Sequence, residues 1–303
     1  EMCIRDRNRT LSNFFPYVML FCLVVMWGSA FAALKISLET ISPLNVMSLR
    51  LIIGSITVLL FFLILNKKLP ISLNFWLWSF LIGFLGFSLP FSIIAWGAQF
   101  ISSSLVAILM GINPIITLIL SYILLKDRSF NLRIIFGIFS GLFGIILLVG
   151  LNSLYNLTIN DNFFIGQIAV LGGTFSFALA SVIIKNAPTE NSFERSLSSL
   201  ICGSIIGLLI VYFSGDRSLS YAQISIKSIT SLILLGVFPT GIATLLWFKI
   251  ISLKGPLFLS LVNYLIPVWA LFIGIFFLNE KINFVIGFGL IFITMGIWLI
   301  EKR

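Results

Sequence analysis

The residue best placed to do chemistry inside an apolar stretch of this chain is Arg50. It lies about seven residues into the hydrophobic segment 44–65, roughly 10 Å from the start of that segment if it is helical. An arginine at such a depth usually faces the interior of a helix bundle or an aqueous cavity, where it could bind a ligand carboxylate or act at a gate. Alternatively, its long side chain could reach the membrane surface. Lys35, at the end of segment 14–36, has the same alternatives and favours anchoring at the surface.

The acidic residues are informative because of their positions. Away from the chain ends, the carboxylates map to loops or to the ends of hydrophobic segments: Glu39, Asp127, Asp161, Glu190, Glu194, Asp216 and Glu280. Histidine is absent. Membrane enzymes need clusters of such groups for metal or acid–base chemistry, so we predict no enzyme activity, no metal site and no cofactor. Proton coupling usually relies on a carboxylate at mid-membrane, so a facilitator or an exchanger without a buried titrating group fits as well.

Aromatic side chains supply a second set of candidates for a ligand pathway. Trp27, Ser29 and Phe31 lie near the middle of segment 14–36, where a tryptophan suggests the wall of a cavity rather than a membrane interface. Trp96 and Trp247 end two other segments, 75–98 and 228–249. At segment ends, an interfacial aromatic belt is the stronger interpretation, and a pocket is the alternative.

Two polar stripes each lie beside a proline inside a hydrophobic segment. One consists of Asn113 and Thr117, continued by Ser121, and the other of Ser260, Asn263 and Tyr264. They could line a path for a solute or form hydrogen bonds between helices, which contribute only about 0.6 kcal/mol per pair on average. Pro114 and Pro267 each free a backbone carbonyl, so they could be hinges or tolerated bends.

These residues are positioned by segments that make the chain an integral membrane protein. Apolar residues make up 59% of it and charged residues 10%, whereas soluble domains carry about a quarter charged residues. Such long apolar runs predict helices rather than the short alternating strands of a barrel. We therefore predict an all-α fold with ten transmembrane helices, over residues 14–36, 44–65, 75–98, 103–125, 132–151, 163–185, 194–213, 228–249, 256–278 and 284–300.

The ten segments indicate an internal repeat. Pro114 stands thirteen residues before Asp127, as Pro267 does before Glu280. Gly137 and Gly144 then align with Gly289 and Gly296. Five segments per copy is an odd number, so the second copy must be inverted, an arrangement typical of secondary transporters with a midplane site. We expect a tail over 1–13, repeats over 14–151 and 163–303, and an extracytoplasmic linker over 152–162.

The glycines of segment 132–151 and the basic residues set further expectations. Gly137, Gly141 and Gly144 have the spacing that lets helices approach closely, within one monomer or between monomers, so a homodimer stays open. With a cytoplasmic N-terminus, the inside loops hold most of the lysines and arginines, which places both termini in the cytoplasm. The formal charge of +9 is scattered through these loops and does not indicate nucleic-acid binding.

As an ensemble, these features resemble the drug/metabolite transporter superfamily, and specifically its ten-helix EamA-type members. The matching residues are Trp27-Gly28-Ser29-Ala30-Phe31 with Lys35, Pro43 with Arg50, and the two proline–carboxylate pairs Pro114–Asp127 and Pro267–Glu280. Asp127 departs from the glutamate that this family usually has at that helix end. The resemblance implies export or exchange of small metabolites, amino acids among them, across the inner membrane.

The sequence thus predicts a secondary transporter that moves a small-molecule substrate across a lipid bilayer by alternating access between two inverted repeats. The alternatives are an integral-membrane enzyme, which would need clustered acidic or histidine groups, and a non-transporting membrane scaffold or sensor. A scaffold or sensor would be expected to carry a soluble module or a large loop, and the ten segments fill nearly the whole chain.

Overall fold

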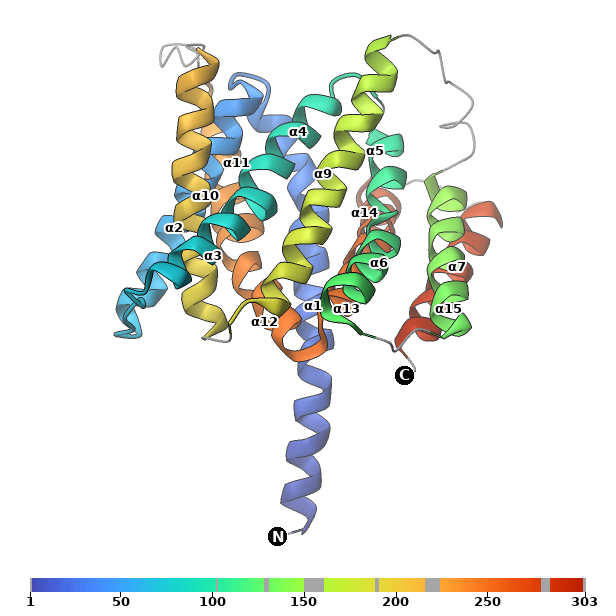
Figure 1. Ribbon diagram of the computed structural model, residues 1–303. Coiled ribbons are helices and arrows are strands. Elements are labelled where there is room, and N and C mark those ends of the chain that lie inside the picture. The colour runs from blue at the N-terminus through green and yellow to red at the C-terminus, as the bar shows by residue number, and fades with distance from the viewer. Residues whose placement is uncertain are drawn as a thin grey trace.

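The computed structural model describes residues 2–101, 103–127, 131–149, 161–188, 191–215, 224–278 and 284–301. Within these ranges the regular elements are helices, and ten stretches are long and apolar enough to cross a membrane. The predicted all-α fold with ten transmembrane helices is therefore confirmed. Met2 and Glu301, at the two ends of the described chain, lie on the same side of the bundle (Figure 1).

The first five spans are formed by α1 (Met2–Ser37), α2 (Pro43–Ile64), α3 (Leu73–Gly83), η1 (Phe84–Ser88), α4 (Leu89–Gly97), α5 (Ser103–Met110), α6 (Asn113–Leu125) and α7 (Leu132–Val149). The second five are formed by α9 (Asp161–Asn186), α10 (Ser192–Ser214), α11 (Ile226–Leu235), η3 (Gly236–Ile242), α12 (Ala243–Lys254), α13 (Pro256–Ser260), α14 (Val262–Leu278) and α15 (Phe284–Glu301).

The predicted segments differ from these helices in continuity more than in position. Residues 2–13, expected to form a tail, continue α1 as a helix that projects from the bundle (Figure 1). The fourth span is divided between α5 and α6, and the ninth between α13 and α14. The third and eighth spans each contain a π-helical segment, η1 and η3. The expected linker over 152–162 lies almost entirely outside the described residues.

The glycines of the last span in each half face one another. A Cβ on Gly144 would lie 2.7 Å from the Gly289 carbonyl oxygen, and one on Gly137 would lie 2.9 Å from the Gly296 carbonyl oxygen. The backbones of α7 and α15 therefore touch, and rising residue number in one helix pairs with falling residue number in the other. The two equivalent helices are antiparallel, as an inverted repeat requires.

The second span of each half is paired in the same reciprocal way. Ser55 of α2 and Ser204 of α10 are joined by a hydrogen bond of 2.6 Å between their hydroxyls. Towards one end the ring of Phe62 stacks on that of Phe193, and towards the other end Met47 lies against Gly207. These two helices are therefore also antiparallel.

The remaining interfaces interleave the two halves. Helix α4, in the third span of the first half, packs on α9, the first span of the second half. The reverse pair is also present, because α1 packs on α11 of the third span in the second half. Helix α3 packs on α10 as η3 packs on α2, and α6 packs on α9 as α14 packs on α1. Most large interfaces thus join one half to the other, so the hydrophobic core belongs to both.

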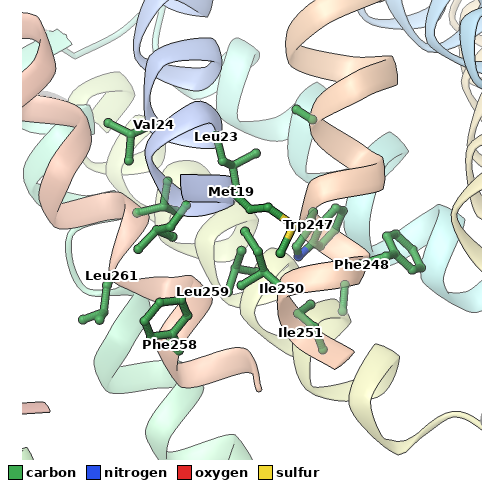
Figure 2. Packing of buried hydrophobic residues seen from close by; sticks show 14 of the residues in the cluster. Met19, Leu23, Val24, Trp247, Phe248, Ile250, Ile251, Phe258, Leu259 and Leu261 are labelled. Carbon is green, nitrogen blue, oxygen red and sulfur yellow. The ribbon is translucent and has the colours of Figure 1, made fainter. Parts of the chain in front are cut away.

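The centre of that core lies where α1 meets α12 and α13. Figure 2 shows Met19 and Leu23 of α1 directed towards Trp247 and Ile250 of α12. Leu23 and Ile250 are completely buried. This packing fixes the side of α1 that carries Trp27, one turn further along the same helix.

Candidate functional site

Five aromatic rings form a continuous cluster in the interior: Trp27, Phe87, Phe91, Phe177 and Trp247, here called the aromatic cluster. Trp247 stacks on Phe177 with ring centroids 4.7 Å apart and meets Phe87 edge to face at 5.2 Å. Trp27 meets Phe177 at 5.5 Å, and Phe91 meets Phe87 at 6.2 Å. The rings come from four spans and from both halves of the chain, so the cluster lies at the interface of the repeats.

Arg50 lies at one end of the aromatic cluster. Its guanidinium carbon is 4.2 Å from the centroid of the Phe91 ring, a cation–π contact. Its Nε donates a hydrogen bond of 3.0 Å to the hydroxyl of Thr240 in η3. Because α2, α4 and η3 surround the side chain, Arg50 faces the interior rather than the membrane surface. It is only partly buried.

The π-helical segment η3 links Arg50 to Trp27. Pro239 has no N–H, so the Leu235 carbonyl loses its usual partner four residues on. In a π segment each carbonyl pairs with the N–H five residues on, and the Thr240 hydroxyl also donates to the Leu235 carbonyl, at 2.9 Å. The Pro239 carbonyl in turn accepts a hydrogen bond of 3.0 Å from Trp27 Nε1. One distorted turn thus contacts an arginine from the second span and a tryptophan from the first, and π segments often mark functional positions.

Pro239 and Thr240 were not among the residues singled out from the sequence. The signal that could have identified them is the proline inside the eighth span, because the third span also carries one, Pro90, close to its own π segment η1. There the Ser88 hydroxyl donates to the Gly203 carbonyl at 2.8 Å. Gly86 of η1 also touches Trp247, so both π segments border the aromatic cluster.

The two tryptophans in corresponding places of the repeats have different surroundings. Trp247 is 1% exposed and donates a hydrogen bond of 3.3 Å to the Ser181 hydroxyl. Trp96 is 45% exposed and contacts Phe100, with ring centroids 5.0 Å apart. Of the predicted pathway residues, the structure brings Trp27, Arg50 and Trp247 together and leaves Trp96 apart from them.

Three predicted residues on α1 have exposed side chains: Ser29, Phe31 and Lys35. The Ser29 hydroxyl accepts a hydrogen bond of 3.2 Å from Trp269 Nε1 of α14. Trp269 also covers Gly28, where a Cβ would lie 2.5 Å from its ring. This face of α1 is thus held against the ninth span.

The polar residues of the fourth span are buried at the α6–α9 interface. Thr117 donates to the side-chain oxygen of Asn113 at 3.0 Å, and the Asn113 amide donates to the Thr174 carbonyl of α9 at 3.5 Å. Both side chains therefore have partners within the fold. The Ser121 hydroxyl, one turn further, is buried without a hydrogen-bond partner among the described residues.

The polar residues of the ninth span surround the break between α13 and α14. Ser260 donates to the Leu257 carbonyl at 2.6 Å, and the Asn263 amide donates to the Ser260 carbonyl at 3.1 Å. Both contacts satisfy carbonyls at a helix end. The Tyr264 hydroxyl donates to the Ile138 carbonyl of α7 at 2.9 Å, and its ring lies against Gly141.

The two predicted hinge prolines lie in different local structures. Pro114 is in the first turn of α6, just after the break at Gly111 and Ile112, where its missing N–H leaves no internal hydrogen bond unmade. Pro267 lies inside the continuous helix α14, six residues after the break at Leu261.

Contacts join the two halves at both ends of the bundle. At the end that carries the termini, the Tyr17 hydroxyl of α1 donates to the Glu301 carboxylate, and Lys254 Nζ donates to the Tyr17 hydroxyl at 3.5 Å. At the opposite end α4 crosses α9, and a Cβ on Gly97 would lie 2.7 Å from the Gly166 carbonyl oxygen. The contact at the end with the termini is polar, and the contact at the opposite end is between helix backbones.

Metal-ligating side chains do not gather in the described ranges: no three His, Cys, Asp or Glu residues there lie close enough to hold an ion. What the interior offers instead is one guanidinium beside an aromatic surface. This arrangement can bind an anion and pack an apolar or aromatic group.

Comparisons with known proteins agree with the architecture. A crystal structure that is 14% identical matches with a TM-score of 0.78 over 95% of this chain and 98% of that chain, which shows the fold alone. The uncharacterized transporter YoaV of Bacillus subtilis is 27% identical over 91% of this chain and 93% of its own length. Protein PecM of Dickeya dadantii is 23% identical over 91% of this chain and 89% of its own length.

The family comparison matches each half separately. A model of the EamA-like transporter family matches residues 14–150 and again residues 164–301. These two matches fall on the two sets of five spans. The chain belongs to the EamA-like transporter family.

Proposed function

We propose that the protein is a secondary transporter, an exporter or exchanger, of small organic metabolites that carry a carboxylate. Amino acids are the class that the family resemblance favours. The observation that carries the proposal is Arg50, a guanidinium in the interior beside the aromatic cluster. Among the described residues no carboxylate is paired with it, so a carboxylate of the solute would supply the missing charge.

The aromatic cluster suggests the rest of the solute. Trp27, Phe91 and Phe177 are the partly buried rings of the cluster, and Trp247, which is 1% exposed, packs behind Phe177. Aromatic groups pack on such rings with favourable offset or edge-to-face contacts. An aromatic amino acid would place its carboxylate at Arg50 and its ring against the cluster. We infer non-enzymatic transport from this pairing of one charge with an apolar wall.

Alternating access would operate on the contacts that join the halves at each end of the bundle. Opening towards the side of the termini would separate Tyr17 from Lys254 and Glu301. Opening towards the other side would separate Gly97 from Gly166. We propose that the protein lies in the inner membrane with both termini cytoplasmic, because most of the lysines and arginines lie in the loops on that side.

The test is counterflow in liposomes that contain the purified protein, with labelled phenylalanine and a set of unlabelled competitors. Arg50→Ala should weaken the apparent affinity by roughly 10- to 100-fold, which corresponds to the loss of a charge-assisted hydrogen bond of about 1.5–3 kcal/mol. Lys227→Ala is the matched control, because it removes an exposed positive charge at the start of α11. Counterflow unaffected by Arg50→Ala would contradict the assigned site.

A further inference from the structure

The orientation of Arg50 is set by the Thr240 hydroxyl, which can act towards it only as a hydrogen-bond acceptor. The Thr240 hydroxyl uses its proton on the Leu235 carbonyl at 2.9 Å, so towards Arg50 it can only accept. That first bond is made within the π segment itself, to the carbonyl five residues earlier. Thr240 is also tightly enclosed, since a Cβ on Gly54 of α2 would lie 2.8 Å from its methyl group. The acceptor for Arg50 Nε is therefore fixed in place by the backbone of η3.

Two sides of the guanidinium are occupied by the protein. Thr240 takes the Nε side, and the Phe91 ring covers one face at 4.2 Å. The described residues give the two terminal nitrogens, Nη1 and Nη2, no hydrogen-bond partner, and the side chain is only partly buried. The edge left open is the one between Nη1 and Nη2. A carboxylate matches that edge with two parallel hydrogen bonds.

The charge around this edge favours a carboxylate over a phosphate group. One guanidinium balances the single negative charge of a carboxylate, whereas a phosphate monoester carries close to two charges at neutral pH. The excess charge would lie among Phe91 and the other rings of the aromatic cluster, where an unpaired charge is costly.

We propose that Thr240 is a positioning residue that turns Arg50 so that Nη1 and Nη2 form an end-on receptor for a carboxylate, which makes the site selective for acids over the corresponding amides. This inference rests on the proposed function, because it specifies how the solute is recognised. It assigns the selectivity to a residue that need not touch the solute.

The experiment measures how fast phenylglyoxal modifies Arg50 in proteoliposomes, resolved from the other arginines by peptide mass spectrometry. Phenylacetate and phenylacetamide are added separately as protecting probes, because they differ in the carboxylate alone. In the protein without substitutions, phenylacetate should slow the reaction of Arg50 with phenylglyoxal, and phenylacetamide should not. Inorganic phosphate is the third probe, and protection by phosphate without protection by phenylacetate would overturn the assignment to carboxylates.

The variants separate positioning from general structure. Thr240→Val removes the hydroxyl and keeps the shape, and it should raise the phenylacetate concentration for half-protection by about 10-fold. Thr240→Ser is the matched control because it keeps the hydroxyl. Its phenylacetate concentration for half-protection should stay within about twofold of the value for the protein without substitutions. Thr240→Ala, which also lacks the hydroxyl, serves if the valine variant does not accumulate.

The remaining outcomes are also decisive. Equal protection of Arg50 in the valine and serine variants would overturn the role of Thr240. If Arg50 of the protein without substitutions did not react with phenylglyoxal, or if phenylacetate did not protect it, the open receptor would be overturned. Because this assay reports binding without transport, its failure is distinct from a failure of counterflow, which would count against the proposed function alone.

Discussion

The contact between α7 and α15 allows one structural prediction to be worked out from distances. In Gly144→Leu the new Cβ would lie 2.7 Å from the Gly289 carbonyl oxygen and must move to at least 3.4 Å, so the helices must separate by at least about 0.7 Å. The carbonyl oxygen belongs to the helical backbone and the position of the Cβ is fixed by it, so no side-chain rotation relieves the overlap. Overpacking of this kind costs about 1–3 kcal/mol or more. The better helix propensity of leucine returns about 1 kcal/mol, which leaves a net loss of up to about 2 kcal/mol over that range.

The free energy of unfolding would be measured by titration with sodium dodecyl sulfate in mixed micelles. Gly287→Leu is the matched control, because it makes the same exchange on α15 at a position where a Cβ meets nothing within 4 Å. It should leave the stability unchanged or raise it. Equal stability of the Gly144 and Gly287 variants would refute the proposed backbone contact.

A double substitution tests whether the two glycines share that contact. A Cβ on Gly289 would lie 3.0 Å from the Gly144 carbonyl oxygen, so one separation of the helices relieves both overlaps. Gly144→Leu combined with Gly289→Leu should therefore cost less than the two single losses added together. Strict additivity would indicate that the two positions act independently.

Two further predictions concern the ninth span and the chain ends. Tyr264→Phe removes the hydrogen bond to the Ile138 carbonyl and should lower the free energy of unfolding by about 0.6 kcal/mol, and by no more than about 1.7 kcal/mol; an unchanged value in the same detergent titration would argue against this bond. Green fluorescent protein fused to either end should fluoresce, and alkaline phosphatase fused to either end should stay inactive, if both termini are cytoplasmic. Opposite behaviour of the two ends would contradict the assignment of sides.

The ten spans could be predicted because each depends on the hydrophobicity summed over about twenty consecutive residues. Each span is a long apolar run, and the run alone decides that it becomes a helix in lipid. The segment predicted over 44–65 is the helix Pro43–Ile64 in the structure, and the segment predicted over 284–300 is the helix Phe284–Glu301. The glycine spacing of segment 132–151 likewise predicted a close helix approach, within one monomer or between monomers, and the structure gives α15 as the partner.

The interruptions of the helices were harder to predict because they depend on single hydrogen bonds. Both midspan prolines looked equivalent, yet Pro114 opens a new helix and Pro267 lies inside one, with the break six residues earlier at Leu261. The π segment η3 contains Pro239, which lacks the N–H that an α-helix would use, and the Thr240 hydroxyl adds a hydrogen bond to the Leu235 carbonyl. A hydrophobicity pattern contains no such information.

The candidate site was predicted in part for a similar reason. Arg50 stood out as a charge inside an apolar segment and Trp27 as an indole near the middle of one, and the structure brings both to η3. Trp247 and Trp96 occupy equivalent positions in the two copies, but one is buried against Phe177 and the other is exposed. Which of them faces inward is decided by neighbours from other spans, and a single segment cannot reveal them.

The interleaving of the two halves has a consequence for how the protein could be assembled from pieces. Because α7 pairs with α15, α2 with α10, and α4 with α9, each half finds most of its apolar partners in the other. A gene divided between the codons for Val149 and Asp161 should therefore yield two fragments that are degraded when made singly. Produced together in one cell, the fragments should recombine into a complete ten-span protein without a covalent connection.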